Sequence, residues 1–137
     1  MYPSEIVTPM KAELTENGFE ELVTPDEVDT TLGSGGTTLV MVNSVCGCAA
    51  GSARPGVVMA VHNAHKRPDR LTTSFAGFDL AAVKRITEHL LPYPPSSPSI
   101  ALFKDGQLVH MVERHQIEGR PAHVIANHLI AAFEAYC

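Results

Sequence analysis

Two cysteines separated by one glycine, Cys46-Gly47-Cys48, are the residues of this chain whose type and spacing best suit chemistry. A thiolate attacks disulfides and binds soft metals, and two thiols so close in sequence can also bond to each other. A pair of small, buried cysteines can also do no more than fill space. The spacing alone therefore leaves three interpretations open: thiol–disulfide exchange, metal binding and packing.

The surrounding sequence predicts that the pair lies where a strand ends and a helix begins. Residues 37–42 are β-branched and apolar on both faces, which is typical of a buried central strand, and an Ala-rich helical stretch continues to about Ala64. Free amides and the positive end of the helix dipole favour an anion, so a thiol placed there ionises more readily than a free cysteine. We expect Cys46 to be the nucleophile and Cys48 to resolve the mixed disulfide formed on it.

Three neighbours of the cysteines are candidates for supporting roles. Asn43 and Ser44 either hydrogen-bond the thiolate of Cys46 or shape the loop, and both roles stay open. Gly47 has no Cβ and can adopt the unusual backbone angles that a Cys-x-Cys ring needs. A strained ring should be readily reduced, which favours accepting electrons or shuffling disulfides over acting as a strong reductant. Arg54, about two turns further on, could add positive field at the thiolate, but we expect its side chain to be solvated.

The metal alternative is a Zn or Cu carrier or sensor that uses both thiolates. There is no second cysteine pair, and His62 and His65 fall near the far end of the same helix. We therefore favour exchange and expect no metal site. The remaining cysteine, Cys137, is expected to be an unreactive terminal thiol. Four other titratable residues are expected to be ordinary surface side chains: His115, Glu118, His123 and His128.

The first elements of the chain precede the pair. We expect a helix over residues 3–17. Thr24-Pro25-Asp26-Glu27 combines a capping box with a proline at the first helical position, which predicts a short helix ending near Leu32. The glycine-rich segment 33–36 cannot continue that helix. Pro55 should kink the helix that follows the cysteines.

Further elements follow the predicted crossover helix. We expect a strand over 71–76, a helix capped by Asp79 and running to Leu91, strands over 100–103 and 108–112 around a turn at 104–107, and a helix over 121–136. The residues expected on the buried sides of the two helices are Leu80, Val83, Ile86, Leu90, Val124, Ile125, Leu129, Ala132, Phe133 and Tyr136. The predicted order is two helices followed by β-α-β-α-β-β-α, which is an α/β fold with a mixed sheet.

The segment Asn43 to Gly51, NSVCGCAAG, followed by Ala53-Arg54-Pro55, resembles the active-site segment of bacilliredoxins, small thioredoxin-like proteins with a Cys-Gly-Cys centre. Residues 111–119, MVERHQIEG, and the C-terminal Tyr136-Cys137 resemble further parts of that family, so the likeness covers most of the chain. It implies a thioredoxin-like three-layer fold in one domain, residues 1–137. In that domain, 37–137 form the core and 1–36 a helical addition.

Residues 97–106, SPSIALFKDG, are similar to the thioredoxin stretch in which a cis-proline opens a strand. The resemblance implies that Pro98 is cis and that its neighbourhood, with Ser97 and Gly47, binds the substrate beside the nucleophile. No Trp precedes Cys46, and the centre is one residue shorter than Cys-x-x-Cys. The general reductase role of thioredoxin is therefore not implied.

For a bacilliredoxin the resemblance implies removal of bacillithiol from oxidised protein cysteines, with disulfide isomerase activity as a further expectation. The partners are then oxidised or bacillithiolated client proteins. Bacillithiol is the expected low-molecular-weight co-substrate, and no tightly bound cofactor is expected.

Composition excludes several other classes. The chain has 137 residues, 45% of them hydrophobic, and a formal net charge of -5, which argues against a nucleic-acid surface. No apolar run approaches the length of a membrane span. The first residues lack the basic and apolar pattern of an export signal, and three cysteines are too few for a disulfide-stapled secreted fold. We expect a cytoplasmic monomer or weak dimer.

Overall fold

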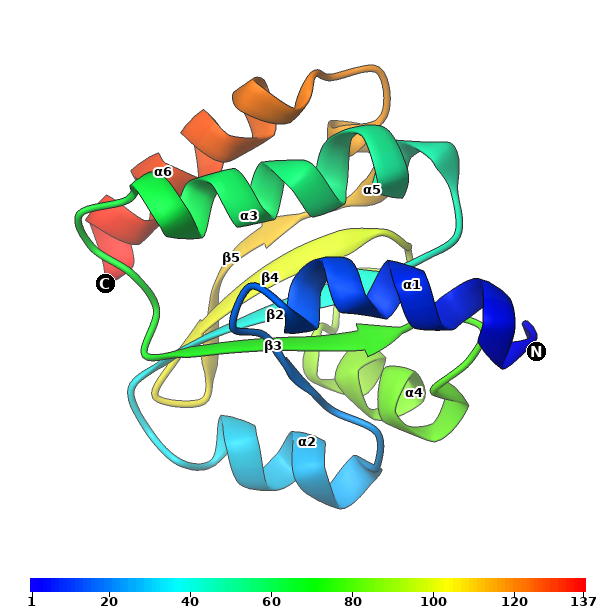
Figure 1. Ribbon diagram of the computed structural model, residues 1–137. Helices are drawn as coiled ribbons and strands as arrows, with labels where there is room; N and C mark the ends of the chain where they lie inside the picture. Colours follow the sequence, from blue (N-terminus) through cyan, green and yellow to red (C-terminus); the bar gives the residue numbers. More distant parts are fainter.

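The computed structural model describes all of residues 1–137 as a five-stranded mixed sheet with helices on both faces (Figure 1). The α-helices are α1 (Ser4–Thr15), α2 (Pro25–Leu32), α3 (Arg54–Asn63), α4 (Leu80–His89), α5 (Arg114–Ile117) and α6 (Ala122–Tyr136), and a π-helical turn, η1 (Ala49–Ala53), precedes α3. The strands are β1 (Glu20–Glu21), β2 (Thr37–Asn43), β3 (Arg70–Phe75), β4 (Ser99–Lys104) and β5 (Gln107–Val112). The predicted fold class, α/β with a mixed sheet, is confirmed.

Strand β2 lies at the centre of the sheet, whose order is β1-β3-β2-β4-β5. It pairs in parallel with β3, through the crossover helix α3, and antiparallel with β4. Strands β4 and β5 form the predicted hairpin, with positive φ at Asp105 and Gly106. Positive φ at both central residues is typical of the turn that follows the twist of paired strands.

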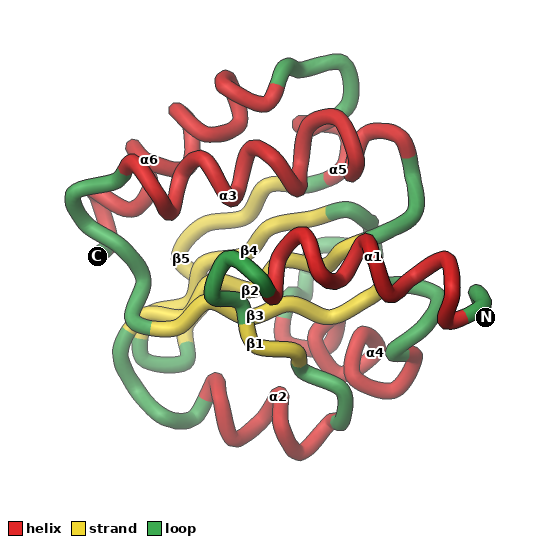
Figure 2. The backbone as a smooth tube through the Cα atoms, viewed as in Figure 1, coloured by secondary structure: helices red, strands yellow, loops and turns green.

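Alternate residues of β2 enter two separate cores. Leu39 and Met41 pack with α1, α3 and α6, whereas Val40 and Val42 pack with α2 and α4. Figure 2 shows the same arrangement, with helices above and below the sheet. The strand is buried along its whole length, which is why it carries apolar residues on both faces. The sheet is thus the middle of three layers.

Two short elements, β1 and α5, are absent from the predicted order. Strand β1 pairs in parallel with Thr72 and Thr73 of β3. The sequence of its two glutamates does not favour a strand. They adopt strand geometry because they pair with the edge of a sheet that other strands form. Residues 1–36, expected to add two helices to the core, therefore also contribute an edge strand.

The predicted helix signals are confirmed in α2 and partly so in α4. In α2, Thr24 and Glu27 form the expected capping box. Helix α4 begins after Asp79, but this carboxylate accepts a hydrogen bond from the N–H of Phe75 at 2.9 Å, not from the helix. The expectation that Leu80 is buried is wrong, because it lies about 200° around the helix from the buried Ala82.

The helical stretch after the cysteines is irregular immediately before Pro55. In η1 the turn is widened, and the N–H of Arg54 bonds to the carbonyl oxygen of Ala49. Proline has no N–H to donate to the backbone hydrogen bonds of the helix. An irregular turn at this point therefore agrees with the kink predicted at Pro55.

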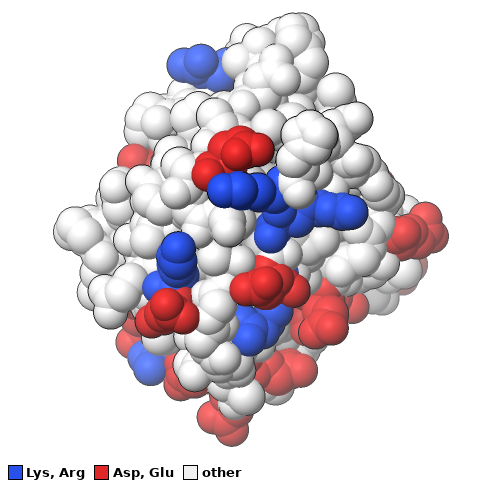
Figure 3. All heavy atoms as spheres, turned by 90° about the vertical axis from the view of Figure 1, so that its left-hand side faces the viewer, with Lys and Arg blue, Asp and Glu red and all other residues white.

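The outside of the molecule has two features that bear on the predicted exclusions. None of the helices has both the length and the apolar character needed to cross a bilayer. On the face that carries the C-terminus, lysine and arginine side chains lie among acidic ones and do not form a stripe (Figure 3).

Candidate active site

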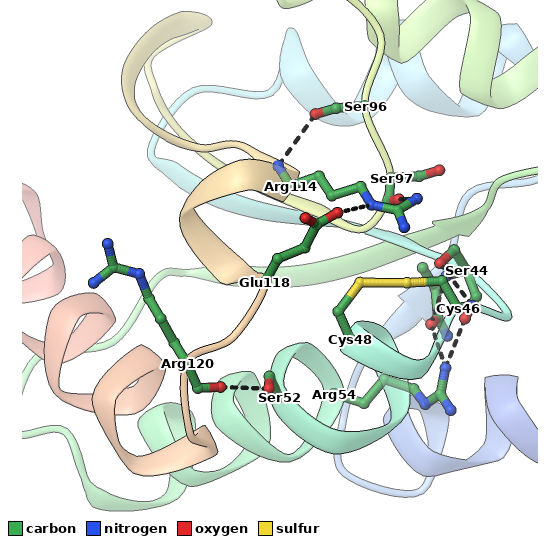
Figure 4. The surroundings of a disulfide bond; sticks show 11 residues. Ser44, Cys46, Cys48, Ser52, Arg54, Ser96, Ser97, Arg114, Glu118 and Arg120 are labelled. Carbon is green, nitrogen blue, oxygen red and sulfur yellow. Dashed lines mark hydrogen bonds and ion pairs between the residues drawn. A yellow bond between two sulfur atoms is a disulfide. The ribbon is translucent and has the colours of Figure 1, made fainter.

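Cys46 and Cys48 form a disulfide just after the end of β2, with their Cα atoms 5.5 Å apart (Figure 4). Both residues are partly exposed. The carbonyl oxygen of Cys46 accepts hydrogen bonds from the N–H groups of Ala49 and Ala50 at 3.0 and 3.2 Å, so the helical turn begins here. The pair lies at the predicted strand-to-helix junction, and its two side chains meet.

The idea that Gly47 supplies unusual backbone angles is wrong. Its φ is not positive, and a Cβ built on it would have no atom within 4 Å. The helical backbone itself brings residues 46 and 48 to a separation that a disulfide can span, so the ring has no need of glycine. Gly47 is exposed beside the sulfurs, and its predicted contact with substrate stays a prediction.

Asn43 and Ser44 shape the loop in front of the disulfide. The side-chain oxygen of Asn43 accepts a hydrogen bond from the N–H of Ser44 at 2.9 Å, and the hydroxyl of Ser44 accepts one from the N–H of Cys46 at 3.2 Å. Both residues are buried. The structure therefore shows the loop-shaping role, and a hydrogen bond to the thiolate of reduced Cys46 stays a prediction.

Arg54 lies under this loop, and the expectation that it is solvated is wrong. Its side chain is 2% exposed, and its Nη1 donates to Asn43 Oδ1 at 3.1 Å and to the carbonyl oxygen of Ser44 at 2.7 Å. Its Nε lies 3.1 Å from a carboxylate oxygen of Glu13, in an ion pair that lacks hydrogen-bond alignment. We call Asn43, Ser44, Cys46 and Arg54 the loop network.

The register of the sheet brings further residues to this end of β2. Val42 pairs with Ser99, so Ser97 and Pro98, which precede Ser99, lie opposite the residues that follow Val42. The Ser97–Pro98 peptide bond is cis, as the resemblance implied, and Pro98 is buried. A second cis bond, Leu91–Pro92, was not expected.

Arg114, the first residue of α5, reaches the same place just after the end of β5. Its Nη1 donates to the carbonyl oxygen of Ser97 at 3.2 Å, its N–H donates to Ser96 Oγ at 3.4 Å, and its Nε contacts the carboxylate of Glu118 (Figure 4). The sequence predicts no role for Arg114 beyond its place in a segment that resembles the family. The pairing of Ile100 with Val112 is the signal that places it beside Ser97.

Other candidate residues lie away from the disulfide. Cys137 contacts Thr37, the first residue of β2, so about the length of that strand, roughly 20 Å, separates it from Cys46. Burial raises the pKa of the Cys137 thiol, and the Asp69 carboxylate adds to the effect. His62 is occupied by a contact of 2.9 Å with Asn17.

Sequence comparisons identify relatives over nearly the whole chain. The family model described as disulphide isomerase matches residues 2–137. A bacilliredoxin of Cytophaga hutchinsonii is 55% identical over 134 residues, which cover 98% of each chain. A bacilliredoxin of Halalkalibacterium halodurans is 50% identical over 138 residues, covering 99% of this chain and 94% of that one.

Structural comparisons identify the fold. The oxidised form of mitochondrial thioredoxin 3 from Saccharomyces cerevisiae matches 90% of this chain and 98% of its own, with a TM-score of 0.59 and 14% identity. A mutant thioredoxin from Halobacterium salinarum matches 88% of this chain and 91% of its own, with a TM-score of 0.59 and 16% identity. These likenesses show a thioredoxin fold, as the resemblance implied. With the relatives above, they place the chain in the bacilliredoxin family of thiol–disulfide oxidoreductases.

Proposed function

We propose that this protein removes bacillithiol from mixed disulfides on client proteins, with Cys46 as the nucleophile and Cys48 as the resolving thiol. The observation that carries the proposal is the asymmetry of the pair. Cys46 lines a small hollow together with Ser97 and Arg114, whereas Cys48, in the first helical turn, is not among the residues that line it. A substrate that enters the hollow therefore meets Cys46 first.

The surroundings of Cys46 support a negative charge on its sulfur. The N–H groups of Gly47 and Cys48 have no acceptor within the chain, as is usual in the first turn of a helix. The buried guanidinium of Arg54 adds a positive charge beneath the loop. Both features favour the thiolate, which is the attacking species.

The proposed reaction has two exchange steps. The Cys46 thiolate attacks the bacillithiol sulfur, a bond from Cys46 to bacillithiol forms, and the client cysteine leaves as a thiolate that takes up a proton. The Cys48 thiolate then attacks Cys46 Sγ, the disulfide forms, and bacillithiol leaves. Two further thiols reduce this disulfide, and they are oxidised to a disulfide themselves. A second bacillithiol attacking the mixed disulfide directly is the route that bypasses Cys48.

We assign substrate binding to Ser97, Pro98 and Gly47. The carbonyl oxygen of Ser97 is already bonded to Arg114, but the N–H of Ser97 has no acceptor in the chain and is free for a substrate carbonyl. Pro98 fixes the position of this backbone, and Gly47 leaves open space beside the sulfurs.

The same chemistry extends to disulfide isomerisation when the client disulfide is wrongly paired, and we propose a cytoplasmic site of action, where thiols are kept reduced. The soft-metal alternative has less support. Nowhere in the structure do three or more His, Cys, Asp or Glu side chains gather in a way that suits a metal ion, so the two thiolates lack further ligands.

The test uses a client protein whose single cysteine carries bacillithiol. A Cys48→Ser variant should accumulate bacillithiol on Cys46, observed by intact mass and peptide mapping, while a Cys46→Ser variant should leave the client modified. Cys137→Ser is the matched control and should behave like the wild type. Equal loss of bacillithiol from the client in all variants would contradict the assignment.

A further inference from the structure

The hollow beside Cys46 has one charged residue in its wall, Arg114. Its volume is about 160 Å³, and its other lining residues are uncharged: Tyr2, Ser44, Val45, Ala76, Gly77 and Ser97. A second hollow of about 460 Å³, between α4 and the start of β4, shares Ala76, Ser97 and Arg114 with the first. Arg114 therefore lies where the two hollows meet.

The guanidinium of Arg114 is held in place but not fully used. One nitrogen donates to the carbonyl oxygen of Ser97, and Nε contacts Glu118. An arginine has more N–H donors than these two contacts use, and the side chain is 46% exposed. It therefore keeps donors for a ligand, in the planar geometry that suits a carboxylate.

We propose that Arg114 binds a carboxylate of the low-molecular-weight thiol that reacts at Cys46, and so selects anionic thiols over neutral or cationic ones. The inference rests on the proposed function and names the chemistry of its small substrate. The chain carries a formal net charge of -5, so its overall field repels anions and a preference for them needs a local cation. Arg114 is the cation that shares a wall with Cys46.

The size of the hollow agrees with this assignment. Complete ligand pockets usually measure about 300–1,000 Å³, so the smaller hollow has room for the sulfur-bearing end of a thiol and the larger one for the rest. The carboxylate of Glu118, half exposed, occupies one side of the guanidinium and competes with the ligand. Removing its charge should therefore strengthen the binding of an anionic thiol.

The bond changes are those of one exchange reaction. The Cys46 thiolate attacks a sulfur of a symmetrical disulfide of the small thiol, a bond from Cys46 to that sulfur forms, and one thiol leaves as a thiolate. No other oxidant or reductant takes part. The equilibrium constant of this reaction therefore measures how well the site holds the attached thiol.

The experiment uses the full chain carrying Cys48→Ser and Cys137→Ser, so that Cys46 is the only thiol. Three probes are equilibrated with it: the disulfides of N-acetylcysteine, of its methyl ester, and of cysteamine. They present a negative, a neutral and a positive group. The fraction of Cys46 in mixed disulfide is read by intact mass. Comparing variants with the same probe cancels the acidity of the probe thiol.

With Arg114→Gln, we expect the equilibrium constant for N-acetylcysteine to fall about tenfold, the size of one charge-assisted hydrogen bond at a partly exposed site. The methyl ester should be unaffected and cysteamine should bind slightly better. Arg114→Lys should restore part of the loss, and Glu118→Gln should raise the constant for N-acetylcysteine. Arg120→Gln, which removes an exposed charge outside the hollow, is the matched control.

An equal loss for all three probes would overturn the inference and assign Arg114 to holding the Ser97 loop. The same anion-specific loss in Arg120→Gln would also overturn it, in favour of a general charge effect. If the Cys48→Ser, Cys137→Ser protein with Arg114 intact forms no mixed disulfide at Cys46 with any probe, the proposed function itself is contradicted, which is a different result.

Discussion

Nη1 of Arg54 donates a 2.7 Å hydrogen bond to the carbonyl oxygen of Ser44, two residues before Cys46. The same nitrogen holds the side chain of Asn43, so one buried cation joins α3 to the end of β2. A loop of this kind needs internal donors because its polar groups are out of reach of water. The cation thus fixes the backbone from which Cys46 projects.

Arg54→Met should destabilise the protein by about 1 to 3 kcal/mol, because it leaves the buried carbonyl oxygen of Ser44 without its donor and removes one of the two donors to Asn43 Oδ1. The measurement is urea unfolding of the oxidised form, with alkylation of reduced Cys46 as a second readout that should slow. Arg120→Met, at an exposed arginine, is the control and should change the free energy of unfolding little. Equal stability of the two variants would contradict the role of Arg54.

Gly47→Ala should fold normally and be up to about 1 kcal/mol more stable, since a Cβ meets no atom and alanine is the better helix former. The same methyl group should slow exchange with a protein client more than exchange with a small thiol, because it crowds the open side of the disulfide. Thermal unfolding and the two exchange rates check this. A loss of stability would mean that the ring does need glycine.

Cys137 should react slowly with iodoacetamide at pH 7.5, because burial raises its pKa and keeps the thiol protonated. The rate of this reaction should rise only as the pH increases beyond the usual pKa of a cysteine. At pH 7.5 the unfolded chain, whose Cys137 has an ordinary pKa, should react faster than the folded protein. A chain carrying Cys46→Ser and Cys48→Ser isolates this thiol. Equal rates in folded and unfolded protein would show that the C-terminus leaves Cys137 uncovered.

The contact of His110 with His128, 2.8 Å between their Nε2 atoms, should make stability depend on pH. Burial lowers the pKa of His110, and the charge of His128 lowers it further. The unfolded chain therefore binds a proton at a higher pH than the folded protein does, so stability should fall as pH drops through the usual histidine range, near 6.5.

His110→Gln should reduce this dependence, measured as the difference in unfolding midpoint between pH 7.5 and pH 5.5. His123→Gln, an exposed position on α6, serves as the control. If His110→Gln and the wild type lose stability in parallel on acidification, the histidine pair is not its source.

Local chemistry made much of the fold predictable. A capping box at Thr24 and Glu27, a turn at Asp105-Gly106 and a doubly apolar strand at 37–42 each have one favoured structure. The buried apolar strand also predicts the strand-to-helix junction at Cys46, because the strand ends just before this residue. Strand β1 was not predictable in this way, because its two residues become a strand only by pairing with β3.

Of the surroundings of the disulfide, only the place of the two cysteines and the cis bond at Pro98 could be predicted. Arg54 was missed because a charged residue in a helix usually faces water, and its burial depends on acceptors presented by another element. The polar pair Asn43-Ser44 between a buried strand and a helix was the available signal, since such groups need donors. Arg114 was missed because its place depends on the register of two strands.

The register of β4 and β5 links the tip of their hairpin to the surroundings of Ser97 at the other end of these strands. The β4–β5 ladder shifts by one residue between Leu102 and Phe103, so the hairpin length from its tip to Val112 sets where Arg114 stands against Ser97. Adding or deleting one residue at the tip, or straightening the shift, would turn the side chains of β5 to the opposite face. Under the proposed role of Arg114, a change of length at the hairpin tip would therefore alter which thiols are bound without any change at Cys46 or Cys48.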